Sequence, residues 1–308
     1  MIGSKALFYA LSRSRAFKRL ASKYGMATPE SFAYRFIAGE TTDDAIAVAR
    51  ALQARGLRLT LDYLGESVST SAAAAEAARQ YIRLMETVVA AGVERNVSLK
   101  LSQMGLAVDR ATCIDNLRRI LDPADRHGFF VRIDMEDSSM TDVTLEVFET
   151  LWAQQHRNVG VVLQAYLYRT ENDVKRMNEL GARVRLVKGA YREPTSVAYR
   201  SKADVNSAFA RLMRVLMDEG TYPAFATHDP HSIEQTRRYA AERGVASDHY
   251  EFQMLYGIRR DLQTTLVAEG YRMRIYVPFG TEWFPYFMRR LGERPANLGF
   301  VVRSLMHD

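Results

Sequence analysis

A chain of 308 residues that is 47% hydrophobic and 25% charged can bury a large core and has the composition of a globular protein. No apolar run approaches the roughly 18 residues of a membrane-spanning helix, and the single cysteine, Cys113, excludes an internal disulfide and favours a reducing compartment. The net charge of +6 arises at the N-terminus, where six Lys and Arg residues and no acid precede Glu30. Removing those six from the 42 basic residues leaves as many as the 36 acidic ones, and this balance argues against nucleic acid as a partner.

The basic segment at residues 5–24 permits a helix with Lys5, Arg15, Arg19 and Lys23 on one side and apolar residues on the other. Such a helix suits an anionic membrane surface, and a helix docked on the protein with a solvated basic side is an equal alternative. The segment lacks the pattern of a secretory signal but shares its lack of acids with organellar transit peptides. We expect a cytoplasmic protein, with the inner membrane surface as a candidate contact. A second helical piece at about 29–54 completes an N-terminal helical arm, placed at 1–50.

The remaining residues, 51–308, are predicted to form one catalytic domain in which strands and helices alternate. Apolar runs bounded by glycine or charge breaks predict eight strands: 57–64, 97–104, 129–136, 159–166, 183–190, 222–229, 249–256 and 272–280. Helical periodicity between them is clearest at 72–93 and 205–217. Strict alternation predicts an α/β fold with a parallel sheet, and eight units predict its closure into a (β/α)₈ barrel.

The two faces of the predicted strands differ in polarity. One face is apolar and is expected to pack against the helices: Leu59, Leu61, Leu99, Leu101, Val131, Ile133, Val161 and Leu163. The alternate positions are polar: Thr60, Asp62, Ser98, Lys100, Ser102, Arg132, Asp134, Glu136, Gln164, Thr227 or His228, Glu251 and Gln253. Barrel interiors normally hold Val, Ile and Leu, and burying unpaired charge is costly. The charged interior therefore indicates an active site, with paired structural ions as the alternative.

The fifth predicted strand is the densest in charge. Arg185 and Lys188 are three residues apart, so in a regular strand their side chains point to opposite faces. Both reach the barrel mouth only if the strand ends or bulges between them, which Gly189 permits. Two cations there suit an anionic ligand such as a pyrophosphate or a reduced flavin. Arg185 can equally pair with an acid such as Asp134, and the two interpretations are compatible.

The last predicted helix carries two adjacent arginines, Arg289 and Arg290. They point about 100° apart, so they can hold a small carboxylate from two sides, although a solvated helix face is the ordinary alternative. No metal is predicted, because the histidines lack ligand spacing and His231 is expected to begin a helix. No Walker loop or GxGxxG motif follows a strand, but barrels also hold phosphates with strand-end loops and helix N-termini.

Short motifs then follow one another in a fixed order. They are Ser-Leu-Lys100-Leu-Ser, Arg-Ile-Asp134-Met-Glu, Leu-Gln164-Ala-Tyr, Arg185-Leu-Val-Lys-Gly-Ala-Tyr191, Ala-Thr-His-Asp229, Glu251-Phe-Gln-Met-Leu255, Arg274-Ile-Tyr276 and Tyr286-x-x-Arg-Arg-Leu-x-x-Glu293-x-x-x-Asn297. In this ordered set the chain resembles the proline dehydrogenase family, over roughly residues 34–305. Each motif alone is weakly specific, whereas the whole series, on strand ends and the last helix, is strongly specific.

The resemblance implies a distorted barrel that binds FAD non-covalently and oxidises L-proline to 1-pyrroline-5-carboxylate, the first step of proline catabolism, with a quinone-type electron acceptor. It implies FAD contacts at Asp134, Val162, Gln164, Arg185, Lys188, Gly189, Tyr191, Thr227, His228 and Glu293. The implied substrate pocket consists of Lys100, Asp134, Ala190, Leu255, Tyr276, Tyr286, Arg289 and Arg290, with Glu66 pairing with Arg289. Of these, Lys100, Asp134, Tyr276, Arg289 and Arg290 are the expected catalytic residues.

Two departures from the family pattern matter. Arg192 stands where bifunctional relatives carry Trp, which affects one part of the expected FAD contact. The chain has no second dehydrogenase module, so we expect the product to be released or passed to a separate pyrroline-5-carboxylate dehydrogenase.

Two other classes compete with this interpretation. A barrel aldolase with Lys100 or Lys188 as its Schiff-base lysine is the enzyme alternative, because that chemistry needs a lysine at a strand end. A partner at the membrane surface or a nucleic acid, suggested by the basic N-terminus, is the non-enzyme alternative, and it leaves the polar interior unexplained.

Overall fold

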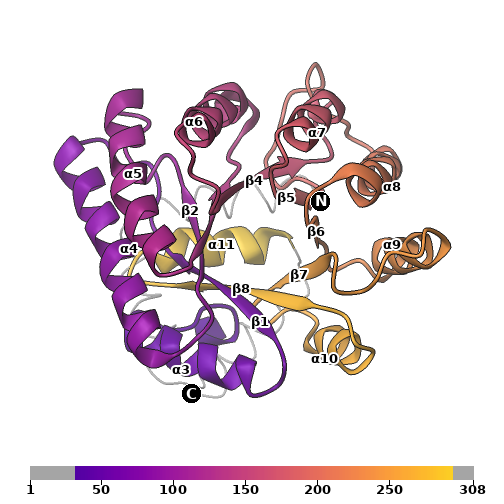
Figure 1. Cartoon of the computed structure of the whole chain (residues 1–308), viewed down its shortest axis with the longest axis horizontal. Helices are drawn as coiled ribbons and strands as arrows, with labels where there is room; N and C mark the ends of the chain where they lie inside the picture. Colours follow the sequence, from indigo (N-terminus) through magenta and orange to yellow (C-terminus); the bar gives the residue numbers. More distant parts are fainter. Residues whose placement is uncertain (1–31, 294–308) are drawn as a thin grey trace.

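Eight parallel strands close into a barrel in the computed structural model, which describes residues 32–293 (Figure 1). Each strand pairs with the next and β8 pairs with β1. The strands are β1 (Arg58–Tyr63), β2 (Asn96–Lys100), β3 (Phe130–Asp134), β4 (Val159–Gln164), β5 (Val184–Val187), β6 (Ala224–Ala226), β7 (Glu251–Leu255) and β8 (Met273–Phe279). The predicted (β/α)₈ barrel and its eight strands are confirmed.

Helices follow the strands and surround them, while the last helix runs across the middle of the ring in Figure 1. They are α3 (Thr42–Gln53), α4 (Ser71–Ala91), α5 (Arg110–Arg126), α6 (Thr141–Ala153), α7 (Thr170–Glu179), α8 (Lys202–Glu219), α9 (Pro230–Glu242), α10 (Arg260–Ala268) and α11 (Trp283–Glu293), with short 3₁₀ turns η1 (Phe32–Arg35) and η2 (Ser138–Met140). The helices expected at 72–93 and 205–217 are confirmed as α4 and α8.

All eight strands end earlier than the sequence predicts. After Lys100, for example, the chain turns: the backbone N–H groups of Gln103 and Met104 both donate to the carbonyl of Lys100. Leu101 and Met104 are apolar and buried, so they read as strand although they form this turn. Shorter strands leave more of each motif in the loops at the carboxyl ends.

The helix expected at about 29–54 is interrupted, which corrects that prediction. Gly39 adopts a φ of +98°, and a new helix, α3, begins after Thr41. The Thr41 side chain accepts a hydrogen bond from the backbone of Asp44, and the Asp44 carboxylate accepts one from the backbone of Thr41, which is a capping box. The buried face of α3 joins the barrel core. The other expected helix, at 5–24, lies outside the described residues.

The polarity of the two strand faces is as predicted. The outward leucines, valines and isoleucine listed above are fully buried in the core between strands and helices. Most of the inward positions are buried as well, whereas Lys100, Asp134 and Glu136 near the carboxyl ends are half-buried. Near the amino ends of the strands, buried charges form ion pairs: Arg274 Nε lies 2.7 Å from Glu251 Oε1, and its Nη1 lies 2.9 Å from Glu94 Oε1. The charges at this end are structural, and those near the carboxyl ends remain for a site.

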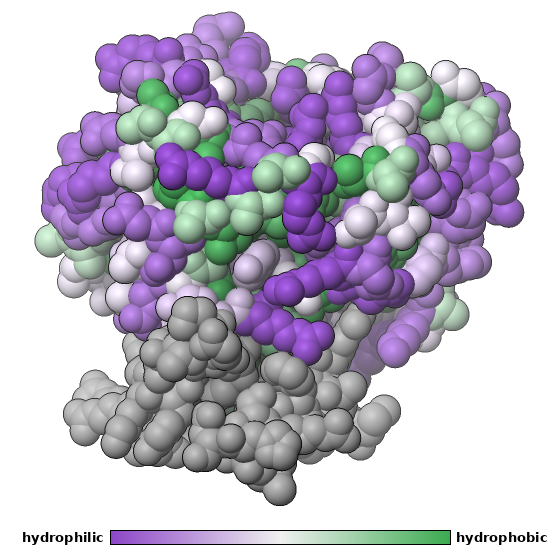
Figure 2. Space-filling view, turned by 90° about the horizontal axis from the view of Figure 1, so that it is seen from below, coloured by the Kyte–Doolittle hydropathy of each residue, from purple (hydrophilic) through white to green (hydrophobic). Residues whose placement is uncertain are grey.

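The exterior seen from below is largely hydrophilic, with smaller hydrophobic areas between the polar side chains (Figure 2). Within residues 32–293, each helix is too short or too polar to cross a lipid bilayer.

Candidate active site

Four of the predicted residues meet inside the barrel near the carboxyl ends of the strands. Asp134, the last residue of β3, accepts a hydrogen bond of 2.7 Å from Arg185 Nη1 and one of 2.6 Å from the Tyr276 hydroxyl. Lys100 Nζ, at the end of β2, lies 3.8 Å from Asp134 Oδ2. The predicted pairing of Arg185 with Asp134 is thus confirmed. Burial and the Asp134 charge raise the pKa of Tyr276 well above its usual value, so its hydroxyl stays protonated and acts as a donor.

Asp62 of β1 also belongs to this group, although the sequence assigned it only an inward position. Its side chain is 1% exposed, and its Oδ2 lies 3.5 Å from Lys100 Nζ. Burial raises the pKa of the Asp62 carboxyl, while the charge of Lys100 lowers it. The site therefore contains two carboxylates with one ammonium between them.

The loop after β5 places the second cation. Because β5 ends at Val187, the side chain of Lys188 is not bound to the outward face that the strand pattern would give it. Its Nζ lies 2.6 Å from Asp229 Oδ2 and 2.6 Å from Asn206 Oδ1. Gly189 has a φ of +113°, and a Cβ there would lie 2.4 Å from the ring of Tyr166. The backbone thus turns tightly against an aromatic ring, in a way open only to glycine.

The neighbouring strand ends supply further predicted cofactor contacts. Val162 and Gln164 of β4 are buried, and the Gln164 amide donates to the carbonyl of Glu136 at 2.9 Å. Thr227, after β6, is buried, and His228 Nε2 accepts a hydrogen bond of 3.0 Å from the backbone N–H of Leu255. Neutral His228 consequently carries its proton on Nδ1.

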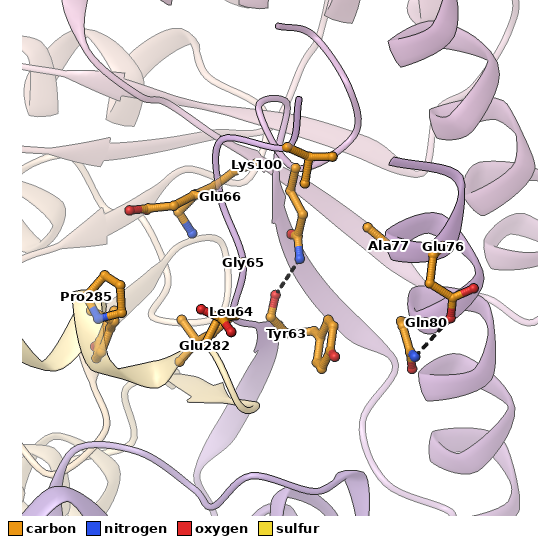
Figure 3. A pocket seen from close by; sticks show the side chains of 13 residues that line it. Tyr63, Leu64, Gly65, Glu66, Glu76, Ala77, Gln80, Lys100, Glu282 and Pro285 are labelled. Carbon is orange, nitrogen blue, oxygen red and sulfur yellow. Dashed lines mark hydrogen bonds between the residues drawn. The ribbon is translucent and has the colours of Figure 1, made fainter. Parts of the chain in front are cut away.

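A cavity of about 360 Å³ lies beside Lys100. Its walls come from the loop after β1, from α4, from the end of β2 and from the start of α11 (Figure 3). Glu66, Lys100 and Tyr286 line it, as the substrate assignment requires. Leu255 and Tyr276 are not among its lining residues.

Some predicted residues are not among the described residues that line this cavity. Ala190 and Tyr191 are exposed in the loop after β5. Arg289, Arg290 and Glu293 belong to α11, but their side chains lie outside the described part of the structure. The Glu66–Arg289 pair therefore stays a prediction.

Two remaining sequence features have clear positions. Cys113 is buried in the core, and burial raises the pKa of its thiol to about 12, which disfavours a thiolate nucleophile. His231 lies in the first turn of α9, as expected, with Asp229 as the N-cap residue. Among residues 32–293, His, Cys, Asp and Glu side chains form no group of three suited to a metal ion.

Sequence reasoning missed two partners of the site. Asp62 could have been found, because it has the inward parity of Lys100 and Asp134. Asn206, which holds Lys188, comes from α8 and carries no signal in the sequence.

The chain is similar to known proteins over most of its length. A family model described as proline dehydrogenase matches residues 45–303. Proline dehydrogenase of Deinococcus radiodurans is 44% identical over 280 residues, 90% of each chain, and proline dehydrogenase 2 of Bacillus subtilis is 39% identical over 302 residues, 98% of each chain.

Longer proteins share the same barrel. The bifunctional protein PutA of Escherichia coli is 29% identical over 319 aligned residues, which cover 87% of this chain and 24% of PutA. The crystal structure of proline utilization A (PutA) from Bdellovibrio bacteriovorus matches with a TM-score of 0.79 and 28% identity, over 84% of this chain and 32% of that one. The barrel, the cluster around Lys100 and Asp134, and the relatives agree: the chain belongs to the proline dehydrogenase family, oxidoreductases of proline catabolism.

Proposed function

We propose that the protein oxidises L-proline to 1-pyrroline-5-carboxylate with FAD as its cofactor. The observation that supports this most is the cluster of Lys100, Asp134, Arg185 and Tyr276 next to a cavity large enough for a small amino acid. Oxidation removes a hydride from the ring carbon beside nitrogen and a proton from the ring nitrogen, leaving a C=N bond. Such a reaction needs chiefly orientation and electrostatics from the protein.

The residues at the strand ends fit a flavin nucleotide. Arg185 Nε is buried without a hydrogen-bond partner in the described structure, which leaves a donor for a bound group. Lys188 adds a second cation, and Gly189 lets the backbone approach closely. Together with Val162, Gln164, Tyr191, Thr227, His228 and Glu293, these residues are the proposed FAD contacts. FAD, when bound, supplies the acceptor for the hydride.

The substrate assignment follows from charge and shape. Lys100, with Arg289 and Arg290 of α11, provides cations for the proline carboxylate, and Leu255 and Tyr286 provide apolar surface for the ring. Asp134 keeps Arg185 and the Tyr276 hydroxyl fixed, so it orders the polar cluster beside Lys100. Glu66, at the cavity rim, is the proposed partner of Arg289 when substrate is bound.

The partners of the reaction are proposed from its chemistry. Electrons pass on to a quinone-type acceptor, and the basic N-terminal segment is the proposed contact to an anionic membrane surface where such an acceptor resides. The product passes to a separate pyrroline-5-carboxylate dehydrogenase. With these partners, the proposed location is the cytoplasm, with contact to the inner membrane surface.

One observation bears on the aldolase alternative. A lysine that forms a Schiff base must attack as the neutral amine. Lys188 contacts Asp229 at 2.6 Å, and Lys100 lies between two carboxylates, so both lysines are engaged in ion pairs that a neutral attacking amine would have to give up. The structure thus favours cation roles for both lysines.

A visible spectrum of the purified protein and borohydride trapping separate the two functions. We expect a yellow protein with a flavin spectrum, and no borohydride-stabilised adduct on Lys100 or Lys188 when a carbonyl substrate is added. A colourless protein that traps a carbonyl substrate on Lys100 or Lys188 would replace this proposal by the aldolase.

A further inference from the structure

A buried carboxylate in the barrel lacks the partners that its neighbours have. Both oxygens of Asp62 are buried, and neither accepts a hydrogen bond of normal geometry within the described structure, although the Tyr276 hydroxyl and the Lys100 ammonium lie close enough to lower its pKa. Asp134, on the other side of Lys100, accepts hydrogen bonds from Arg185 and Tyr276, and Glu251 accepts them from Arg274. A buried carboxylate without a compensating cation destabilises a fold, so the role of Asp62 depends on the nearest cation.

That cation is the ammonium of Lys100. Asp62 pairs in register with Ser98, so Lys100, two residues further along β2, lies on the same inward face and next to it. The distance from Lys100 Nζ is 3.5 Å to Asp62 Oδ2 and 3.8 Å to Asp134 Oδ2. Because Arg185 already compensates Asp134, Asp62 is the one of these two carboxylates that depends on Lys100 for its countercharge.

The ammonium also has a direction. Lys100 lines the cavity, whereas Asp62 is 1% exposed and is not among the lining residues. The carboxylate therefore lies behind the ammonium as seen from the cavity. With Asp62 holding it from behind, an N–H group of the ammonium can point into the cavity.

We propose that Asp62 is the positioning residue of Lys100: it keeps the ammonium charged and directed into the cavity, where Lys100 binds the substrate carboxylate. This inference rests on the proposed function, because that function assigns a carboxylate ligand to Lys100. Asp62 acts through Lys100 and does not itself touch the substrate.

Other titratable groups near Lys100 and its cavity also act on the charge of its ammonium. They are Asp134 of β3, Arg185 of β5, Tyr276 of β8, Tyr63 and Glu66 at and after the end of β1, Glu76 and Tyr81 of α4, Glu282 just before α11 and Tyr286 within it. Most of the carboxylates among them line the cavity itself, and Asp62 is the fully buried one behind the ammonium. Removing its charge makes the neutral form of Lys100 more accessible, so carboxylate binding becomes weaker as pH rises.

The test is isothermal titration of the flavin-loaded enzyme with cyclopentanecarboxylate, which has the ring and carboxylate of proline but no amine to oxidise. Asp62→Asn keeps the shape and removes the charge. We expect binding about tenfold weaker than wild type near pH 8.5, with a smaller loss near pH 6.5, where Lys100 is charged in both. Asp62→Ser, smaller than the native residue, serves if the amide is not accommodated.

A double-mutant cycle with Lys100→Met distinguishes positioning from a general structural effect. If Asp62 acts through Lys100, then Asp62→Asn in the Lys100→Met background leaves the affinity unchanged. Equal and additive losses in both backgrounds, or a loss independent of pH, would overturn the inference. If wild type and Asp62→Asn bind the analogue equally well, the role of Asp62 is overturned and the proposed function stands. If wild type binds neither proline nor the analogue, both the role of Asp62 and the proposed function are overturned.

Discussion

The ion pair between Glu251 and Arg274 closes the amino end of the barrel, and Glu251→Gln is expected to destabilise the fold strongly. The exposed fractions of the two side chains are 3% and 6%, and Arg274 donates from Nε and Nη2 to the carboxylate at 2.7 and 3.0 Å. Burial raises the pKa of Glu251, but Arg274 outweighs this and lowers it to about 2 from 4.5. Loss of one partner of such a pair costs about 3–5 kcal/mol, or roughly 6–10 °C in Tm for a chain of this size.

The pH dependence of stability tests the same ion pair in a second way. Because the folded-state pKa of Glu251 lies below its unfolded value, its contribution is complete above about pH 4.5 and is lost as pH falls towards 2. The difference in Tm between wild type and Glu251→Gln should therefore be largest near neutral pH and should narrow in acid.

Thermal unfolding followed by circular dichroism at pH 7 and at about pH 2.5 measures both the loss of stability and its pH dependence. The matched control is Glu146→Gln, which removes the exposed pair with Arg110, whose side chains are 50% and 45% exposed. Surface pairs of this kind contribute about 1 kcal/mol or less, so the control should stay close to wild type. The reasoning is refuted if the two variants lose the same stability at pH 7.

Four further predictions concern the site and the N-terminus. Gly189→Ala should lower the flavin content of purified protein, measured by absorbance, because a Cβ there meets an aromatic ring at 2.4 Å; normal flavin content would contradict the assigned backbone approach. Glu66→Ala should raise KM for proline with flavin content intact, and Arg289→Met should raise it further; if their effects in a double-mutant cycle simply add, the two residues do not pair. Tyr286→Ser should narrow the preference for proline over 4-hydroxyproline, because the buried ring crowds a ring hydroxyl; equal kcat/KM for both substrates in the wild type would refute this. Deleting residues 1–24 should reduce co-sedimentation with anionic liposomes, and unchanged binding would remove the membrane contact.

The fold was predictable because two independent patterns agree: apolar and polar residues alternate within each strand, and strands alternate with helices along the chain. Leu59 and Leu61 of β1, like Val131 and Ile133 of β3, alternate with polar residues, and this fixes both the strands and the face that meets the helices. The strand ends were less predictable, because Leu101 and Met104 are apolar and buried yet belong to a turn. The interruption before α3 was readable from the capping box at Thr41 and Asp44, which apolar periodicity alone overlooks.

The site was predictable only in part. The alternation of side chains along the strands places Lys100, Asp134 and Arg185 inside the barrel, but it does not show which carboxylate pairs with which cation. That depends on the distances across the interior, where Arg185 reaches Asp134 and leaves Asp62 to Lys100. Likewise, the sequence shows that Lys188 needs a strand end, whereas its contact with Asn206 requires the folded position of α8.

An anaerobic titration of the purified enzyme with L-proline, followed at the flavin absorbance band, tests the central claim most directly. Two electrons leave each proline, so we expect the flavin to bleach progressively as proline is added, with about one 1-pyrroline-5-carboxylate formed per flavin reduced. A flavin that stays oxidised under excess proline, or one that bleaches without formation of this product, would contradict it.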